Sequence, residues 1–150
     1  VLTSLGQFDE AQVLLERALA IREQSLAADH PWTGTTWANL GRLALRVGDS
    51  KEARRRLQRA LDIIEPALGP DHLYMATVLV NLAGVDDQEG LYEAAEQKIL
   101  QCIQIVEQSL GPDHPQIASH CLAPYPELLG KLGRGDEAEA IRRRIEELQG

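Results

Sequence analysis

Residues 39–68 read NLGRLALRVGDSKEARRRLQRALDIIEPAL, and this stretch determines the predicted fold. After Asp49 the apolar residues keep the i, i+3, i+4, i+7 spacing of one helical face: Ala53, Leu57, Ala60, Leu61, Ile64 and Leu68. Asp49 is a suitable N-cap, and Glu52 three residues later completes a capping-box pattern. Gly69 offers the positive φ that ends helices, and Pro70 prevents continuation. The pattern predicts a helix from Asp49 to Leu68, in which Pro66 removes one hydrogen bond from the last turn.

The residues before Asp49 predict a second helix, from Trp32 to Val47, that ends at Gly48. Asp29 or His30 can cap this helix, and Pro31 falls in its first turn, where a missing N–H costs nothing. One stripe of the helix carries Thr36, Trp37, Leu40, Leu43, Ala44 and Val47. Neither helix has the period of two that is typical of a β-strand, so the predicted fold class is all-α.

This helix pair recurs along the chain with a period of 42 residues. The step is kept by three histidines, three glycines, two sets of small residues and two asparagines: His30, His72 and His114; Gly6, Gly48 and Gly90; Ala11, Ala53 and Ala95; Ala18, Ala60 and Cys102; Asn39 and Asn81. A fourth copy at Gly133 and Ala138 is displaced by one residue, which predicts an insertion between His114 and Gly133. Self-similarity at such a period predicts stacked repeats that bury their apolar faces against neighbours.

The period divides the chain into one array of four parts. We predict a partial first repeat over residues 1–27, helix pairs over 28–68 and 70–110, and a last, proline-interrupted pair over 112–150. In the first part Val1–Leu5 is the remainder of one helix and Phe8–Leu26 forms the other. Pro124 and Pro126 predict an irregular segment over 123–127 and a helical restart over 128–131. Small residues are expected where helix axes cross closely, at Ala18, Ala60, Cys102, Gly41 and Ala83.

The repeated motifs resemble those of the tetratricopeptide repeat. The matching pieces are NLGRLALRVGD with KEARRRLQRAL, and NLAGVDDQEG with YEAAEQKIL. The 42-residue period and the linker ALGPDHLYMATVLVNLA are similar to the longer subtype of kinesin light chains and of many bacterial regulators. The resemblance implies a right-handed superhelical α-solenoid without catalytic activity, which binds an extended peptide or partner protein in its concave groove. It also implies a piece of a larger protein, such as a bacterial regulator.

In this family the concave face is made by the helix that begins after the Asp-His pair. Residue-by-residue mapping places on this face Thr35, Ala38, Asn39, Arg42, Leu45 and Arg46, then Thr77, Val80, Asn81, Gly84 and Gln88. Asn39 and Asn81 would hold the backbone of an extended peptide, because an amide both donates and accepts hydrogen bonds. The alternative is that these amides bond only to neighbouring helix backbone. Arg42 and Arg46 favour an acidic ligand, and the third unit has Ala123 at the asparagine position.

The composition excludes several other kinds of partner. A net charge of −8 argues against a non-specific nucleic-acid binder, which needs a surplus of lysine and arginine. No apolar run approaches the roughly 18 residues of a membrane span. Cys102 and Cys121 are too few for a disulfide scaffold, so the predicted location is the cytoplasm. We expect both to be small buried apolar residues.

The two ends of the array suggest an alternative function. The chain opens at Val1 without a signal pattern, which we interpret as an excised piece of a longer protein. The final helix, residues 136–149, is polar enough to cap the array, whereas nothing caps the face before Val1. The alternative is therefore a structural spacer, or an oligomerisation segment that uses the N-terminal face.

No constellation in the sequence indicates catalysis, a metal or a cofactor. His30, His72 and His114 belong to helix pairs about 8–10 Å apart, too far to share a zinc ion, so we expect them to fix the turns. GKLGRG at 130–135 lacks the spacing of a phosphate-binding loop. His120 is expected to be a packed or surface residue. Arginines 54–56 and Arg59 are expected to be solvated and paired with glutamate, with an RNA contact as the alternative.

Overall fold

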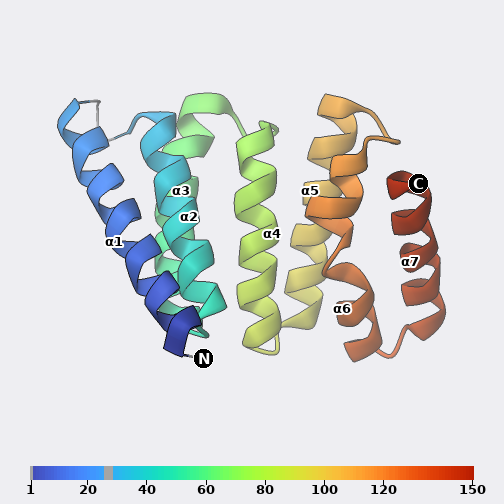
Figure 1. Ribbon diagram of the computed structural model, residues 1–150. Coiled ribbons are helices and arrows are strands. Elements are labelled where there is room, and N and C mark those ends of the chain that lie inside the picture. Colours follow the sequence, from blue (N-terminus) through green and yellow to red (C-terminus); the bar gives the residue numbers. More distant parts are fainter. Residues whose placement is uncertain (1, 26–28) are drawn as a thin grey trace. The chain divides into compact units, whose positions relative to one another are not determined.

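The computed structural model describes residues 2–25 and 29–150. In order, the elements are α1 (Leu2–Ser25), α2 (Pro31–Arg46), α3 (Ser50–Leu68), α4 (Leu73–Gln88), α5 (Tyr92–Leu110), the π-helix η1 (Ile117–Leu122), α6 (Tyr125–Lys131) and α7 (Gly135–Gln149) (Figure 1). The described residues contain no strand, which confirms the predicted all-α class. None of the described helices is long and apolar enough to cross a membrane.

The chain divides into two compact units. The N-terminal unit is Val1–Pro70 with α1 to α3, and the C-terminal unit is Asp71–Gly150 with α4 to α7. The boundary lies between Pro70 and Asp71, within one residue of the predicted start of the second helix pair at residue 70. The stacking of all helices into one right-handed superhelical array of residues 1–150 stays a prediction.

In the N-terminal unit, α2 and α3 pack closely because two glycines lie at their contact. A Cβ atom on Gly34 would be 2.6 Å from Ile64 Cγ1, and one on Gly41 would be 2.6 Å from Leu57 Cγ. Leu57 and Ile64 are both fully buried. The predicted close crossing at Gly41 is therefore confirmed, and only residues without a Cβ fit these contacts.

The ends of the first helix pair follow the sequence pattern in most respects. Gly48 and Gly69 have φ of 85° and 90°, the left-handed values expected where these helices end. Asp49 caps α3, because its carboxylate accepts a hydrogen bond from Glu52 N at 3.1 Å. The predicted reciprocal bond of the capping box is absent among the described contacts. Asp49 N donates to Ala44 O instead, and the Glu52 carboxylate accepts hydrogen bonds from Arg55 and Arg56.

Helix α1 differs from the expectation for a partial repeat. It continues through Gly6, where the period predicted a turn between a short remainder and a second helix. No atom lies within 4 Å of a Cβ built on Gly6, so no packing enforces a turn there, and each added helical residue gains a hydrogen bond. Val1 and Leu26, the outer bounds of the two predicted pieces, lie outside the described residues. Ala18 is only half-buried, whereas Ala60 and Cys102 are fully buried.

In the C-terminal unit, the predicted insertion between His114 and Gly133 coincides with the π-helix η1. A π-turn closes over one residue more than an α-turn, so η1 accommodates one extra residue before the turn at residues 123–124. The predicted irregular segment at 123–127 is confirmed only at residues 123–124, which form a turn, and the predicted helical restart at 128 is three residues too late. The chain becomes α-helical again at Tyr125, because Pro126 lies in the first turn of α6, where its missing N–H has no partner to lose.

Two buried carboxylates hold the C-terminal unit together. Asp86 on α4 is almost fully buried and pairs with Lys98 on α5. Glu96 on α5 accepts hydrogen bonds from Tyr125 Oη at 2.6 Å and from Arg134 Nη1 at 2.7 Å. Burial of Tyr125, together with its hydrogen bond to Glu96, raises the pKa of the phenol to about 12.

Candidate peptide-binding site

The predicted contact residues of α2 lie on one helical face. Thr35 and Asn39 are half-buried, and Arg42 and Arg46 are exposed. Ala38 is only 5% exposed, so its side chain packs beneath this face and offers a ligand little surface. Thr35 Oγ1 donates to Trp32 O at 2.8 Å within the helix. Arg42 and Arg46 therefore form the exposed part of the face, and Asn39 lies beside them.

These three residues line a pocket between α1 and α2, which we call the α1/α2 pocket. Its volume is about 400 Å³, and its lining is Gln7, Phe8, Ala11 and Leu15 from α1 with Asn39, Arg42, Leu43 and Arg46 from α2. Sequence reasoning missed the residues contributed by α1, because the family pattern directs attention to the other helix of each pair. A signal was present, since Ala11 keeps the 42-residue step and Phe8 is the one phenylalanine of the chain.

The charge at the rim of the α1/α2 pocket is uncompensated. Within residues 2–25 and 29–150, neither Arg42 nor Arg46 has a hydrogen bond or an ion pair. By contrast, Arg55 Nη2 and Arg56 Nε on α3 lie 2.6 and 2.8 Å from Glu52 Oε1, which confirms the glutamate pairing expected there. Arg42 and Arg46 lie one helical turn apart on α2, and their unpaired guanidinium groups can therefore bind an anionic ligand.

The two asparagines of the predicted ladder differ. Asn81 Nδ2 donates to Thr77 O on its own helix at 2.8 Å, so one of its two N–H groups is engaged as in the alternative interpretation, and Oδ1 is left to accept. The amide of Asn39 has no partner among the described residues and faces the α1/α2 pocket. The two amides therefore differ in what they can offer a ligand.

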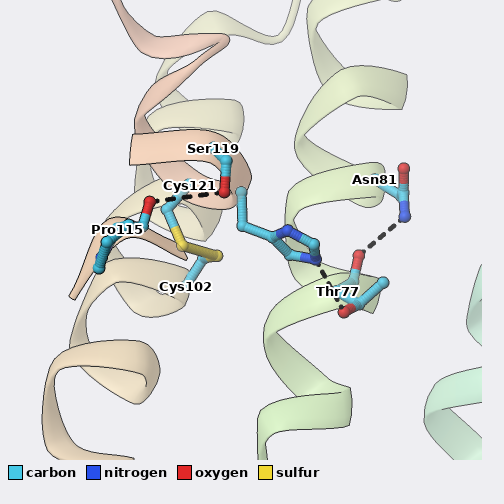
Figure 2. The surroundings of a disulfide bond; sticks show 7 residues. Thr77, Asn81, Cys102, Pro115, Ser119 and Cys121 are labelled. Atoms are coloured by element: carbon cyan, nitrogen blue, oxygen red, sulfur yellow. Dashed lines mark hydrogen bonds between the residues drawn. A yellow bond between two sulfur atoms is a disulfide. The ribbon is translucent and has the colours of Figure 1, made fainter. Parts of the chain in front are cut away.

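On the C-terminal unit, α4 carries the remaining predicted residues. Thr77, Val80 and Asn81 are half-buried, and Gln88 is exposed. His120 Nε2 lies 3.5 Å from Thr77 Oγ1, so η1 brings an exposed imidazole to the edge of this face. Figure 2 shows Thr77 and Asn81 on α4 beside the segment that carries Cys121. His120 was not among the predicted contact residues, because its neighbour Thr77 is 43 positions away in sequence.

The three periodic histidines have the structural role expected of them. The Nδ1 atoms of His30, His72 and His114 accept hydrogen bonds from backbone N–H groups two residues later, at 3.2, 3.1 and 3.2 Å. His30 and His72 thus cap α2 and α4. In the part of the chain that the structure describes, no group of three His, Cys, Asp or Glu side chains could hold a metal ion.

The interpretation of the cysteines needs a correction. Cys102 and Cys121 are fully buried, as expected, but they are joined in a disulfide between α5 and η1 (Figure 2). The sequence places each in an apolar position, whereas only the crossing of α5 and η1 brings the two sulfur atoms together. The cysteine argument for a cytoplasmic location therefore no longer holds, because disulfides persist mainly in oxidising compartments.

Comparisons with known proteins agree with this architecture. The sequence profile of the tetratricopeptide repeat matches residues 1–65 and 48–99. Two crystal structures of nearly identical TPR-like repeats from a Podosopora anserina protein, described as a kinesin light chain, are similar in fold. Their TM-scores are 0.71 for a point variant and 0.68, each at 23% identity over 98% of this chain and 69% of that chain. No curated protein matches the sequence.

Proposed function

The chain belongs to the tetratricopeptide repeat family, and from this premise we propose that it is a non-catalytic module that binds an extended peptide of a partner protein. The observation that carries the proposal is the α1/α2 pocket, in which Asn39, Arg42 and Arg46 lie together. Thr35 belongs to the proposed contact surface of α2, and Thr77, Val80, Asn81 and Gln88 belong to that of α4. Ala38 is left out because it is buried.

The lining of the α1/α2 pocket favours an acidic peptide that also carries an apolar side chain. Phe8, Ala11, Leu15 and Leu43 supply apolar surface, and Arg42 and Arg46 supply charge. The Asn39 amide offers donors and an acceptor to a peptide backbone. A volume of about 400 Å³ falls in the range of sites that bind small ligands, which is enough for a peptide side chain.

The net charge of −8 makes the proposed preference sensitive to salt. Acidic peptides are repelled by the chain as a whole and attracted at the arginine pair, and both effects are screened beyond about 8 Å at physiological ionic strength. Affinity for an acidic peptide should therefore depend on close contacts at α2 rather than on long-range attraction.

The test uses a fluorescent acidic peptide selected by display on the wild-type protein. Arg42→Gln/Arg46→Gln should weaken binding at least about tenfold, because each lost charge-assisted hydrogen bond costs about 1.5–3 kcal/mol. Lys51→Gln/Arg59→Gln is the matched control, since it removes two positive charges from exposed positions of α3. Equal affinities of the two double variants would contradict recognition by the arginine pair.

A second double variant tests the asparagines. Asn39→Ala/Asn81→Ala should weaken the same peptide while the circular dichroism spectrum stays unchanged. We expect Asn39 to account for most of the loss, because the Asn81 donor is already bound to Thr77 O. Unchanged affinity of an intact double variant would remove the groove from the proposal.

A second candidate function, self-association or a structural spacer, is favoured by the surface of α1. Val13, Leu14 and Ile21 are 48%, 64% and 63% exposed, an unusual concentration of large apolar side chains. If a second copy covers this face, light scattering will show a dimer that Leu14→Glu disperses. Leu100→Glu, at an exposed leucine of α5, is the control. A strict monomer at high concentration would exclude self-association.

We also propose that the module works in the cytoplasm as part of a larger regulatory protein of bacterial type. The support is the resemblance to repeats of such regulators. The cysteine pair provides the test of location, since the cytoplasm keeps most thiols reduced. Acid quenching and alkylation of cells should trap Cys102 and Cys121 mainly as thiols, and a constitutive disulfide would contradict the cytoplasmic location.

A further inference from the structure

We propose that the Cys102–Cys121 disulfide is a redox control of the binding surface on the C-terminal unit, and that His120 is a contact residue of that surface. In the oxidised state the bond holds η1 against α5, and η1 places His120 beside Thr77 on α4. This inference rests on the proposed peptide-binding function, because Thr77 and Asn81 belong to the proposed contact surface.

The cysteine pair lies next to the proposed contact surface of the C-terminal unit. Cys102 on α5 and Cys121 on η1 have a Cα–Cα distance of 5.9 Å, and both are fully buried. Cys121 directly follows His120, so the tether acts on the residue next to the exposed imidazole. Figure 2 shows the disulfide on one side of this segment and Thr77 with Asn81 on the other. A movement of η1 relative to α5 would therefore change the position of His120 relative to Thr77.

The η1 segment is short and is followed by two prolines. It is a six-residue π-helix whose preceding residue Gln116 makes no side-chain cap, and the nearest side-chain cap is His114 Nδ1, which accepts from Gln116 N at 3.2 Å. Pro124 and Pro126 follow, and neither can donate a backbone hydrogen bond. Single segments of a fold can open locally at a lower free energy than the whole fold. Apolar burial of Ile117 and Leu122 opposes this opening, and the disulfide adds a covalent constraint across 19 positions.

Formation of the bond requires an oxidant, for which we propose a small disulfide such as oxidised glutathione. When η1 opens, one cysteine thiolate attacks the glutathione disulfide, forms a mixed disulfide and releases one glutathione thiolate, which takes up the proton that the cysteine lost. The second cysteine thiolate then attacks the protein sulfur of the mixed disulfide and releases the second glutathione. Two protein thiols are oxidised, and one glutathione disulfide is reduced to two thiols.

Amide hydrogen exchange tests the positioning. Reduction with a phosphine should raise exchange over residues 117–122 by roughly 10- to 100-fold, while amides of α3 stay unchanged. Cys102→Ala should show the faster exchange with or without the phosphine. This variant keeps the packing, since alanine fills the equivalent position of the preceding repeat at Ala60, which is fully buried. Equal exchange of the wild type in both redox states would overturn the inference.

Binding of the same fluorescent acidic peptide tests the control. The oxidised wild type should bind about tenfold more tightly than the reduced wild type, and Cys102→Ala should match the reduced protein. His120→Ala should weaken binding by the oxidised protein and abolish its response to reduction. Ser119→Ala is the matched control, because Ser119 is an exposed neighbour on η1 whose hydroxyl lies near Pro115 O and not α4.

The outcomes separate the two proposals. Tight binding that is equal in both redox states would overturn the redox control and leave the proposed function intact. A full redox response in His120→Ala would overturn the role of His120. Absence of binding in both states would overturn the proposed function together with its control, and hydrogen exchange would still decide whether the disulfide positions η1.

Discussion

At Gly41 the helices α2 and α3 approach so closely that the space between them does not admit one added methyl group. A Cβ atom there would meet Leu57 Cγ at 2.6 Å and the Leu57 backbone nitrogen at 3.3 Å. Neither atom is the far end of a flexible side chain, so the helices themselves would have to move apart. The smallest residue of the repeat motif thus sets the distance between two helices.

We predict that Gly41→Ala lowers the free energy of unfolding by about 1–3 kcal/mol, the usual effect of overpacking. Gly130→Ala is the control, because nothing lies within 4 Å of its Cβ and alanine favours the α6 helix. It should stabilise the protein by about 0.5–1 kcal/mol. Urea unfolding measures both, and equal effects of the two substitutions would contradict the close crossing.

The carboxylate of Glu52 gives the fold a dependence on pH. Hydrogen bonds from Arg55, and then from Arg56, lower the pKa of Glu52 from 4.5 to about 2. Because the folded pKa is the lower one, the ionised group stabilises the fold above pH 4.5, and this contribution is lost as the pH falls from 4.5 to 2. The side chain is 30% exposed, so screening limits the effect to about 0.5–1 kcal/mol.

Glu52→Gln should therefore destabilise the protein at pH 7 and have little effect near pH 2. Urea unfolding at a series of pH values measures the difference from the wild type. Glu65→Gln, at an exposed position of the same helix, should show no such window. A difference for Glu52→Gln that stays constant across this range would show that the arginine contacts do not stabilise the charged form.

At the scale of elements, the last helix pair is interrupted by a turn, and side-chain contacts to α5 hold its parts in place. The chain passes from η1 to α6 through Pro124, and α6 is fixed to α5 by the hydrogen bond of Tyr125 to Glu96. Arg144 on α7 binds Glu107 on α5 at 2.6 Å, a second polar contact within the unit. Helix α5 therefore anchors the elements that follow it.

We predict that Tyr125→Phe lowers the free energy of unfolding by about 1.5–3 kcal/mol, the range for a hydrogen bond to a charged group. Glu96 keeps Arg134 as its partner in this variant, so the fold should survive. Tyr74→Phe is the control, since the Tyr74 ring is exposed and its contact with His72 does not use the hydroxyl. Thermal unfolding that is the same for both variants would contradict the role of the buried hydroxyl.

At the scale of the whole molecule, the sequence predicts that the stabilities of the N-terminal and C-terminal units are coupled. Repeat arrays gain stability from each interface between neighbours, so a stacked array transmits a local loss of stability to the next repeat. The 42-residue period predicts one array, and therefore coupling between the two units.

Hydrogen exchange of the Gly41→Ala variant tests this prediction. Amides of α4 should exchange faster than in the wild type, although the substitution lies in the other unit. Gly130→Ala should not accelerate exchange in α2. If α4 is unaffected by a Gly41→Ala change that clearly destabilises α2 and α3, the two units fold independently and the single array is wrong.

The sequence by itself determined the features that depend on local preference and repetition. Apolar spacing predicted α3, and Asp49, Gly48 and Gly69 predicted where helices begin and end, because caps and left-handed glycines act within a few residues. The displaced Gly133 predicted an insertion, which η1 accommodates. The family pattern also predicted Asn39, Arg42 and Arg46 as contact residues.

Only the tertiary structure decided which distant residues meet. The residues of α1 in the pocket, the disulfide of Cys102 with Cys121, and the contact of His120 with Thr77 all join different helices. Side-chain periodicity tells which face of a helix is apolar, but the partner of that face depends on the distance and angle at which two helices pack. The chemistry of the candidate site therefore arises from helix packing, whereas the helices themselves follow from the sequence.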